Sequence, residues 1–183
     1  MKNTSIKKII VLQGGEDVAA RANKTLFEQI LALSKTKNIL VIPWTTSDSR
    51  KEKKYRKIIS NYFREVGFKK IFFLEKSDSD QNIREKFSKV DVVYLPGGDP
   101  SILYEEIKKR RLVETKLREF EGIIIGNSAG AIVLSKGTYY DNRFQPGLGL
   151  VDFFIKVHFN LTSQTISKPS LCIPENQWVV IVM

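Results

Sequence analysis

The chain has 183 residues, 42% of them hydrophobic, which is enough to bury one core and predicts a single domain spanning residues 1–183. It contains no run of about 18 apolar residues, so we expect no membrane-spanning helix and no membrane partner. The net charge is +10, but the basic clusters at Lys51–Lys57 and Lys108–Arg111 fall on amphipathic segments interspersed with glutamates. Because no nucleic-acid-binding motif accompanies them, we expect solvated helix faces and no nucleic-acid partner.

The cysteine content and the first residues both favour a cytoplasmic protein. Cys172 is the single cysteine, so no internal disulfide can form, and its apolar surroundings predict a core position. The apolar run Ile9–Leu12 near the N-terminus is too short for the core of a signal peptide and lacks a cleavage site. We expect a cytoplasmic monomer or homodimer.

Short apolar runs alternate with longer amphipathic runs along the chain. The predicted strands are Lys8–Gln13, Asn38–Pro43, Lys70–Leu74, Val90–Leu95 and Gly122–Gly126. The predicted helices are Arg21–Ser34, Lys51–Val66, Gln81–Ser88, Ser101–Arg110, Val113–Phe120 and Ala129–Ser135. This alternation is typical of βαβ units and predicts an α/β fold whose mostly parallel sheet is covered by helices on both faces.

Four of the predicted strands are followed by loops of chemical interest. These loops are Gln13-Gly14-Gly15, Pro43–Thr46, Pro96–Pro100 and the segment around Ser128. Parallel strands end at the same edge of a sheet, and ligands of such sheets bind beyond those ends. Neither Gly-Gly pair completes a dinucleotide or phosphate-loop motif, so we predict no nucleotide.

The segment Gly126–Ala131 reads Gly-Asn-Ser-Ala-Gly-Ala and matches the G-x-S-x-G nucleophile elbow. It follows an apolar run and precedes residues that can begin a helix, which is the context that the elbow requires. Ser128 is therefore a candidate nucleophile, with the N–H groups of Ala129 and of Gly97 or Gly98 as candidate oxyanion donors. A simple Gly-Ser connection between a strand and a helix would give the same pattern, so partners are needed.

A serine nucleophile needs a base, and His158 is the chain's single histidine. It follows Phe153–Val157, which predicts a strand ending at the histidine. Three acids are candidates for orienting the imidazole: Asp141, Asp152 and Glu175. Glu175 stands between two apolar runs, and spacing favours it only slightly over Asp141.

Several sequence blocks, taken in order, resemble the dipeptidase E and cyanophycinase family of serine peptidases. The blocks are Pro96-Gly97-Gly98-Asp99, Gly126–Ala131, Gly147–Val151 with Val157-His158-Phe159, and Ile173–Asn176 with Trp178. The resemblance runs from the first strand to near the end of the chain. It implies a three-layer α/β/α sandwich of the flavodoxin and class I glutamine amidotransferase type.

The resemblance also implies site residues and a substrate class. It implies a triad of Ser128, His158 and Glu175, with Gly98 and Ala129 forming the oxyanion hole. It implies hydrolysis of short peptides, among them aspartyl dipeptides or β-linked aspartate-arginine polymers, without a metal or a cofactor. We further expect the substrate to contact the residues beside these groups, namely Gly97, Asp99 and Asn127.

The chain departs from the family pattern in three ways. Asp99 replaces a common asparagine, and the extra carboxylate is expected to disfavour acidic substrates. Only 17 positions separate His158 from Glu175, so Asn160–Pro169 would form a short loop in place of a helix and its connection. The family usually continues with further strands beyond the position of Met183, which predicts a domain shortened at its C-terminus. An alternative function is therefore a catalytically impaired member that acts as a binding module.

Overall fold

The computed structural model describes residues 8–140, 143–160, 162 and 168–183. Its larger strands are β1 (Lys8–Gln13), β2 (Asn38–Val41), β3 (Lys70–Phe73), β4 (Val92–Leu95), β5 (Gly122–Asn127) and β10 (Trp178–Val182). The helices are α1 (Lys24–Leu33), α2 (Ser49–Val66), α3 (Asp80–Ser88), α4 (Pro100–Lys109), α5 (Arg111–Glu119) and α6 (Ala129–Leu134). The short strands are β6 (Gly137–Tyr140), β7 (Arg143–Pro146), β8 (Ile155–Lys156) and β9 (Leu171–Cys172).

The larger strands form one central sheet in the order β10-β1-β5-β4-β2-β3. All neighbours in it pair in parallel except β10, which runs antiparallel to β1 at one edge. The mostly parallel sheet predicted from the alternating pattern is therefore confirmed. No helix within the described ranges is both long and apolar enough to cross a membrane.

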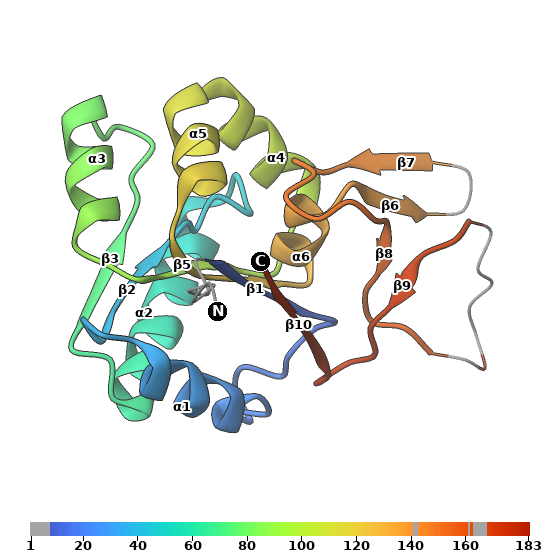
Figure 1. Ribbon diagram of the computed structural model, residues 1–183, viewed down its shortest axis with the longest axis horizontal. Helices are drawn as coiled ribbons and strands as arrows, with labels where there is room; N and C mark the ends of the chain where they lie inside the picture. The colour runs from blue at the N-terminus through green and yellow to red at the C-terminus, as the bar shows by residue number, and fades with distance from the viewer. Residues whose placement is uncertain (1–7, 141–142, 161, 163–167) are drawn as a thin grey trace, which may run out of the picture.

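Helices cover both faces of the sheet and give the expected three-layer α/β/α sandwich (Figure 1). On one face, α1 and α2 bury three aromatic side chains, Phe27, Tyr62 and Phe63. On the other face, α3 to α6 contribute a second buried cluster that includes Ile83, Leu103, Val113 and Ile132. Because the inner strands are covered on both sides, their sequences are continuous apolar runs and not alternating ones.

The ends of α2 are determined by its own capping residues. Asp48 precedes the helix, and its carboxylate accepts the N–H groups of Arg50 and Lys51. Gly67 ends the helix in the left-handed region at φ 113°, which glycine adopts without steric cost. These caps fix the start of α2, and hence Lys51 and Tyr55, beside the carboxyl end of the sheet.

The carboxyl ends of β1, β5 and β4 lie side by side and gather the loops of interest. Gln13 of β1 is in register with Asn127 of β5, and Leu95 of β4 is in register with Gly126. The loop after β2 joins this edge, because the N–H of Asp99 donates to the carbonyl of Thr45 at 2.9 Å. The expectation that these loops share one edge of the sheet is confirmed.

The predicted strand Phe153–Val157 is wrong in length. Only Ile155–Lys156 forms a strand, β8, and it pairs with β9 in a small separate sheet. The chain leaves this strand early because the N–H of His158 donates to the carbonyl of Gly14, at 2.7 Å, instead of continuing the ladder. Cys172, expected in the core, lies in β9 and is only partly buried.

Two other features differ from the sequence predictions. Helix α1 begins three residues later than expected, because Asp17 accepts the N–H groups of Ala19 and Ala20 in a turn and Arg21 has a positive φ of 57°. The hairpin of β6 and β7 was not predicted, and it extends away from the sheet beside β8 and β9 (Figure 1).

Candidate active site

Ser128 lies in a sharp turn between β5 and α6. Its backbone has φ 48° and ψ −104°, a region that L residues rarely occupy, and its N–H donates to the carbonyl of Gln13 at 3.0 Å. The flanking glycines are required, because a Cβ at Gly130 would overlap the Leu95 carbonyl and one at Gly126 would overlap Gly130. The turn therefore holds the serine hydroxyl above the sheet at a backbone cost of about 1–3 kcal/mol.

Three predicted site residues form a continuous chain of contacts. Ser128 Oγ lies 2.7 Å from His158 Nε2, and His158 Nδ1 contacts Glu175 Oε2. The side chains of His158 and Glu175 are 50% and 46% exposed, so a peptide and water can both reach them. One ring nitrogen faces the hydroxyl and the other faces a carboxylate, which is the arrangement that allows an imidazole to take a serine proton.

Two short parallel strands bring His158 and Glu175 together. The N–H of Ile173 in the chain after β9 donates to the Lys156 carbonyl at 2.8 Å, and the N–H of Phe159 donates to the Ile173 carbonyl at 3.2 Å. The chain therefore returns beside itself, and Glu175 reaches the imidazole despite the short segment between them. Residues 161 and 163–167 of the predicted loop lie outside the described residues.

The Gly14-Gly15 loop after β1 packs against His158 and against the loop that contains Glu175. The Gly14 N–H donates to the carbonyl of Gln177 at 3.0 Å, and the Gly15 carbonyl accepts the N–H of Asn176 at 3.1 Å. At Gly15, where φ is 150°, a Cβ would overlap both the His158 ring and the Glu175 carboxylate. Sequence reasoning noticed this glycine pair but missed its role, because the partners lie more than 140 positions away.

The predicted oxyanion donors are Ala129, which follows Ser128 in the chain, and Gly98, which lines the same cavity as Ser128. Ala129 is the first residue of α6, where helical geometry leaves its N–H without an intrahelical acceptor. A Cβ at Gly97 would lie 3.6 Å from the Cβ of Ser128. Gly98 has φ 134° and packs closely against Thr45, so a side chain would not fit there. The backbone of this loop can therefore approach a reacting carbonyl closely.

The other two described acids that the sequence singled out, Asp99 and Asp152, have hydrogen-bond or ion-pair partners other than His158. Asp99 caps α4 by accepting the N–H groups of Ser101 and Ile102, at 2.8 and 3.2 Å, which is a structural reason for a short acceptor side chain at this position. Asp152 is 93% exposed and pairs with Lys136 at 2.9 Å, away from the histidine. Asp141 lies outside the described residues. Asn127 is buried next to Ser128.

A cavity of about 330 Å³ opens beside the serine. It is lined by Glu16, Val18, Tyr55, Gly97, Gly98, Asn127, Ser128 and His158. Behind it lies a buried polar network in which Tyr62 donates to Glu16 at 2.6 Å. Burial raises the pKa of Glu16, although the hydrogen bonds from Tyr62 and from the Asn23 N–H oppose that shift. Sequence reasoning missed Glu16, because nothing in its local pattern distinguishes it.

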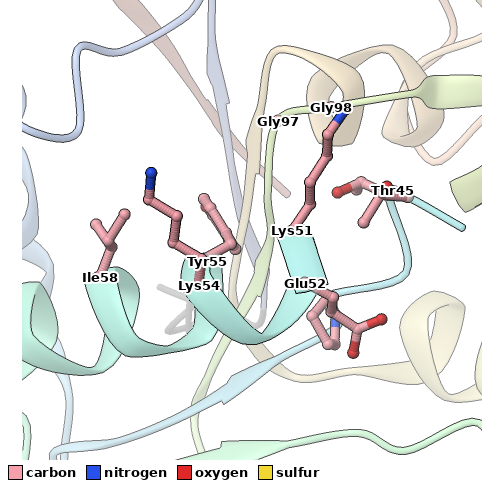
Figure 2. A pocket seen from close by; sticks show the side chains of 10 residues that line it. Thr45, Lys51, Glu52, Lys54, Tyr55, Ile58, Gly97 and Gly98 are labelled. Atoms are coloured by element: carbon pink, nitrogen blue, oxygen red, sulfur yellow. The ribbon is translucent and has the colours of Figure 1, made fainter. Parts of the chain in front are cut away.

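A second cavity of about 410 Å³ adjoins the first and shares Tyr55, Gly97 and Gly98 with it. Figure 2 shows the Lys51 side chain extending from the start of α2 toward Gly98, with Thr45 beside it. Lys54 also lines this cavity. Glu52 lines the second cavity too, and its carboxylate is paired with Arg56 at 2.6 Å. The two cavities therefore differ in charge, since the first contains Glu16 and the second contains two lysines and a glutamate that is already paired.

The fold is similar to those of two proteins of known structure, one described as a peptidase and one as a putative peptidase E. A crystal structure of a peptidase from an acI-B1 Actinobacterium aligns with a TM-score of 0.68 and 20% sequence identity, covering 96% of this chain and 83% of that chain. A protein described as a putative peptidase E from Listeria monocytogenes EGD-e aligns with a TM-score of 0.59 and 20% identity, covering 80% of this chain and 77% of that chain. No curated protein matches the sequence.

A family model gives the assignment that structural similarity at this identity does not give. The model of peptidase family S51 matches residues 9–180, which is nearly the whole chain. The match includes the serine turn, the histidine loop and the glutamate loop, and it confirms the resemblance drawn from the sequence blocks. The chain belongs to peptidase family S51.

Proposed function

We propose that this protein is a serine-type peptidase that hydrolyses short peptides, with Ser128 as nucleophile, His158 as base and Glu175 as the acid that orients the base. The observation that carries the proposal is the continuous contact from Ser128 Oγ, 2.7 Å from His158 Nε2, to the carboxylate on His158 Nδ1. Membership in a peptidase family supports the same reaction class.

In the first half of the proposed reaction, Ser128 Oγ attacks the peptide carbonyl carbon while its proton passes to His158 Nε2. Glu175 accepts the Nδ1–H and stabilises the imidazolium that forms. The tetrahedral intermediate collapses when the C–N bond breaks, and the leaving amine takes the proton from Nε2. The product is an acyl-serine ester, which water then attacks with His158 again acting as base.

The developing negative charge on the carbonyl oxygen requires donors that are already in place. We assign this role to the N–H groups of Gly98, which lines the cavity beside the serine, and of Ala129, which follows the serine at the start of α6. Preorganised donors of this kind contribute about 10²–10³-fold in rate each. The close packing of Gly98 against Thr45 holds its peptide group without any side chain that would block the carbonyl.

The proposed substrates include aspartyl peptides, because the second cavity provides cationic and hydroxyl groups near Gly98. Lys51 and Lys54 supply positive charge there, and Thr45 supplies a hydroxyl (Figure 2). Thr46 also lines the cavity. The sequence predicted that Asp99 would disfavour acidic substrates. Its carboxylate, however, accepts hydrogen bonds from the first turn of α4, and these bonds reduce its repulsion of a bound acidic group.

Covalent labelling tests the nucleophile directly. We expect a fluorophosphonate to form one adduct with the wild-type protein, located on Ser128 by mass spectrometry of the digested chain, because a hydroxyl beside an imidazole is activated for attack. We also expect pre-labelled protein to lose hydrolysis of dipeptides in proportion to labelling. A folded protein that hydrolyses dipeptides but carries its adduct on another residue would refute the assignment.

Substrate charge tests the second cavity. We expect Asp-Ala to be hydrolysed with a higher kcat/KM than the isosteric Asn-Ala, and Lys51→Met to reduce that preference by about threefold to tenfold, because one exposed charge contributes modestly. Lys57→Met, which removes an exposed lysine of the same helix that does not line the cavity, is the control. Equal kcat/KM for the two dipeptides would contradict the aspartyl part of the proposal.

The alternative function is a non-catalytic binding module. It was suggested in part by the short segment between His158 and Glu175, which could have kept the acid away from the imidazole. That segment nevertheless leaves Glu175 in contact with the imidazole. No other observation in the described part of the chain favours this alternative. It predicts a folded protein that neither reacts with a fluorophosphonate nor hydrolyses peptides.

A further inference from the structure

The cavity beside Ser128 has an acidic lining in a strongly basic protein. The chain carries a net charge of +10, yet among the described residues that line this cavity the one carboxylate is Glu16, and no lysine or arginine lines it. An acidic hollow next to a nucleophile is not explained by the proposed reaction, since neither the carbonyl nor the water needs a second carboxylate. The position of Glu16 therefore points to a part of the substrate that carries positive charge.

One oxygen of Glu16 is satisfied and the other is not. Its Oε1 accepts the Tyr62 hydroxyl at 2.6 Å and the Asn23 N–H at 3.1 Å. Its Oε2 is buried and has no hydrogen-bond donor among the described residues. The nearby cation, Arg21, forms a two-pronged ion pair with Glu65, at 2.9 and 3.1 Å, so its charge offsets part of the burial-induced rise in the pKa of Glu16 without a hydrogen bond to this oxygen.

A second acceptor in the same cavity has the same property. Asn127 is only 3% exposed, and its Nδ2 donates to the Tyr94 hydroxyl at 3.4 Å. Its Oδ1 is buried without a donor among the described residues. Buried acceptors left without donors cost about 1–3 kcal/mol each, so a ligand in the adjoining cavity that donated hydrogen bonds to them would recover that cost.

We propose that Glu16 Oε2 and Asn127 Oδ1 bind a cationic nitrogen group of the substrate, which is either the N-terminal α-ammonium group or a basic side chain. The proposal rests on the proposed function, because it takes the cavity beside Ser128 as the place where the peptide binds. An ammonium group carries up to three donors and one positive charge, which suits two acceptors of which one is charged. In a dipeptide the α-nitrogen is two bonds from the scissile carbonyl carbon, so it has to lie in the cavity that contains the nucleophile.

Binding to an inactive protein tests the proposal without turnover. The Ser128→Ala protein is titrated calorimetrically with Asp-Ala, with acetyl-Asp-Ala, which lacks the ammonium group, and with acetyl-Lys-Ala, which carries its cation on the side chain. If the α-ammonium group is the ligand, Asp-Ala binds about 10- to 100-fold more tightly than its acetylated form. If a basic side chain is the ligand, acetyl-Lys-Ala binds that much more tightly than acetyl-Asp-Ala.

The same titrations with an added Glu16→Gln substitution identify the group responsible. This change keeps the acceptor for Tyr62 but removes the charge, and we expect it to abolish the preference for the cationic ligand. Asp17→Asn is the matched control, because Asp17 is the adjacent carboxylate, is exposed, and does not line the cavity. Its carboxylate accepts the N–H groups of Ala19 and Ala20, which an asparagine oxygen also accepts.

Two outcomes would overturn the inference. One is equal affinity of the Ser128→Ala protein for all three ligands, a comparison that needs no change at Glu16 and so does not depend on the folding of that variant. The other is an equal loss of preference in Glu16→Gln and Asp17→Asn. The proposed function fails separately, if wild-type protein forms no fluorophosphonate adduct at Ser128 and hydrolyses no dipeptide while the binding preference persists.

Discussion

Replacing Ser128 with alanine is expected to lower kcat/KM for dipeptide hydrolysis by at least about 10⁴-fold and to abolish the fluorophosphonate adduct. The reason is that the variant lacks the oxygen that attacks the carbonyl, while the imidazole and the oxyanion donors remain. Alanine fits the turn because the side chain contributes nothing to the backbone contact with Gln13, which is made by the N–H of residue 128. Steady-state kinetics with Asp-Ala, together with circular dichroism, measures both the loss of rate and the retention of the fold.

Ser88→Ala is the control for the loss of a serine hydroxyl. Ser88 is exposed at the end of α3, its hydroxyl donates to the Glu85 carbonyl at 2.9 Å, and it lines neither of the two cavities. We expect this variant to retain wild-type hydrolysis and labelling. If the Ser128→Ala protein kept its hydrolytic rate, Ser128 would not be the nucleophile and the proposed mechanism would be wrong.

Replacing Gly15 with alanine is expected to lower kcat by about 100-fold or more, although residue 15 would perform no chemistry itself. A Cβ at this position would overlap the His158 ring and the Glu175 carboxylate, so one or both must shift. A displacement of about 1 Å in a catalytic group costs on the order of 10²-fold in rate. Hydrolysis of Asp-Ala and the rate of fluorophosphonate labelling should fall together, because both depend on the imidazole.

Gly149→Ala separates this steric effect from backbone strain. Gly149 also has a positive φ, of 67°, but a Cβ there would meet no atom within 4 Å. We expect that variant to lose about 1–2 kcal/mol of stability in urea unfolding and to keep its kcat, because only the left-handed backbone is penalised. Wild-type kcat in Gly15→Ala would mean that the His158 and Glu175 positions are not set by the glycine loop.

The sheet, its covering helices and the serine turn could be predicted because each has a local signature. The inner strands are buried on both faces and therefore appear as short apolar runs, and the helices are amphipathic and bounded by capping residues such as Asp48 and Gly67. The turn at Ser128 requires small neighbours on both sides, so Gly126 and Gly130 mark it in the sequence.

The contact between His158 and Glu175 could not be predicted from local pattern. Reasoning from the residues alone left three acids open, and only the family resemblance selected Glu175. The contact depends on pairing between β8 and β9, which have two residues each and no recognisable periodicity. The roles of Gly15 and Glu16 were missed for the same reason, since both arise from contacts with segments distant in sequence.

The antiparallel strand β10 has a consequence for the lifetime of the active state. Gln13 pairs with Trp178, and the Gly14 N–H donates to the Gln177 carbonyl. The antiparallel pairing of β1 with β10 therefore continues into the loop that contains Glu175. An edge strand is among the first segments to detach in local unfolding. In the proposed mechanism, opening of this edge would separate Glu175 from His158 while the core stays folded, and amide exchange along β10 would report the fraction of molecules in which the edge is closed.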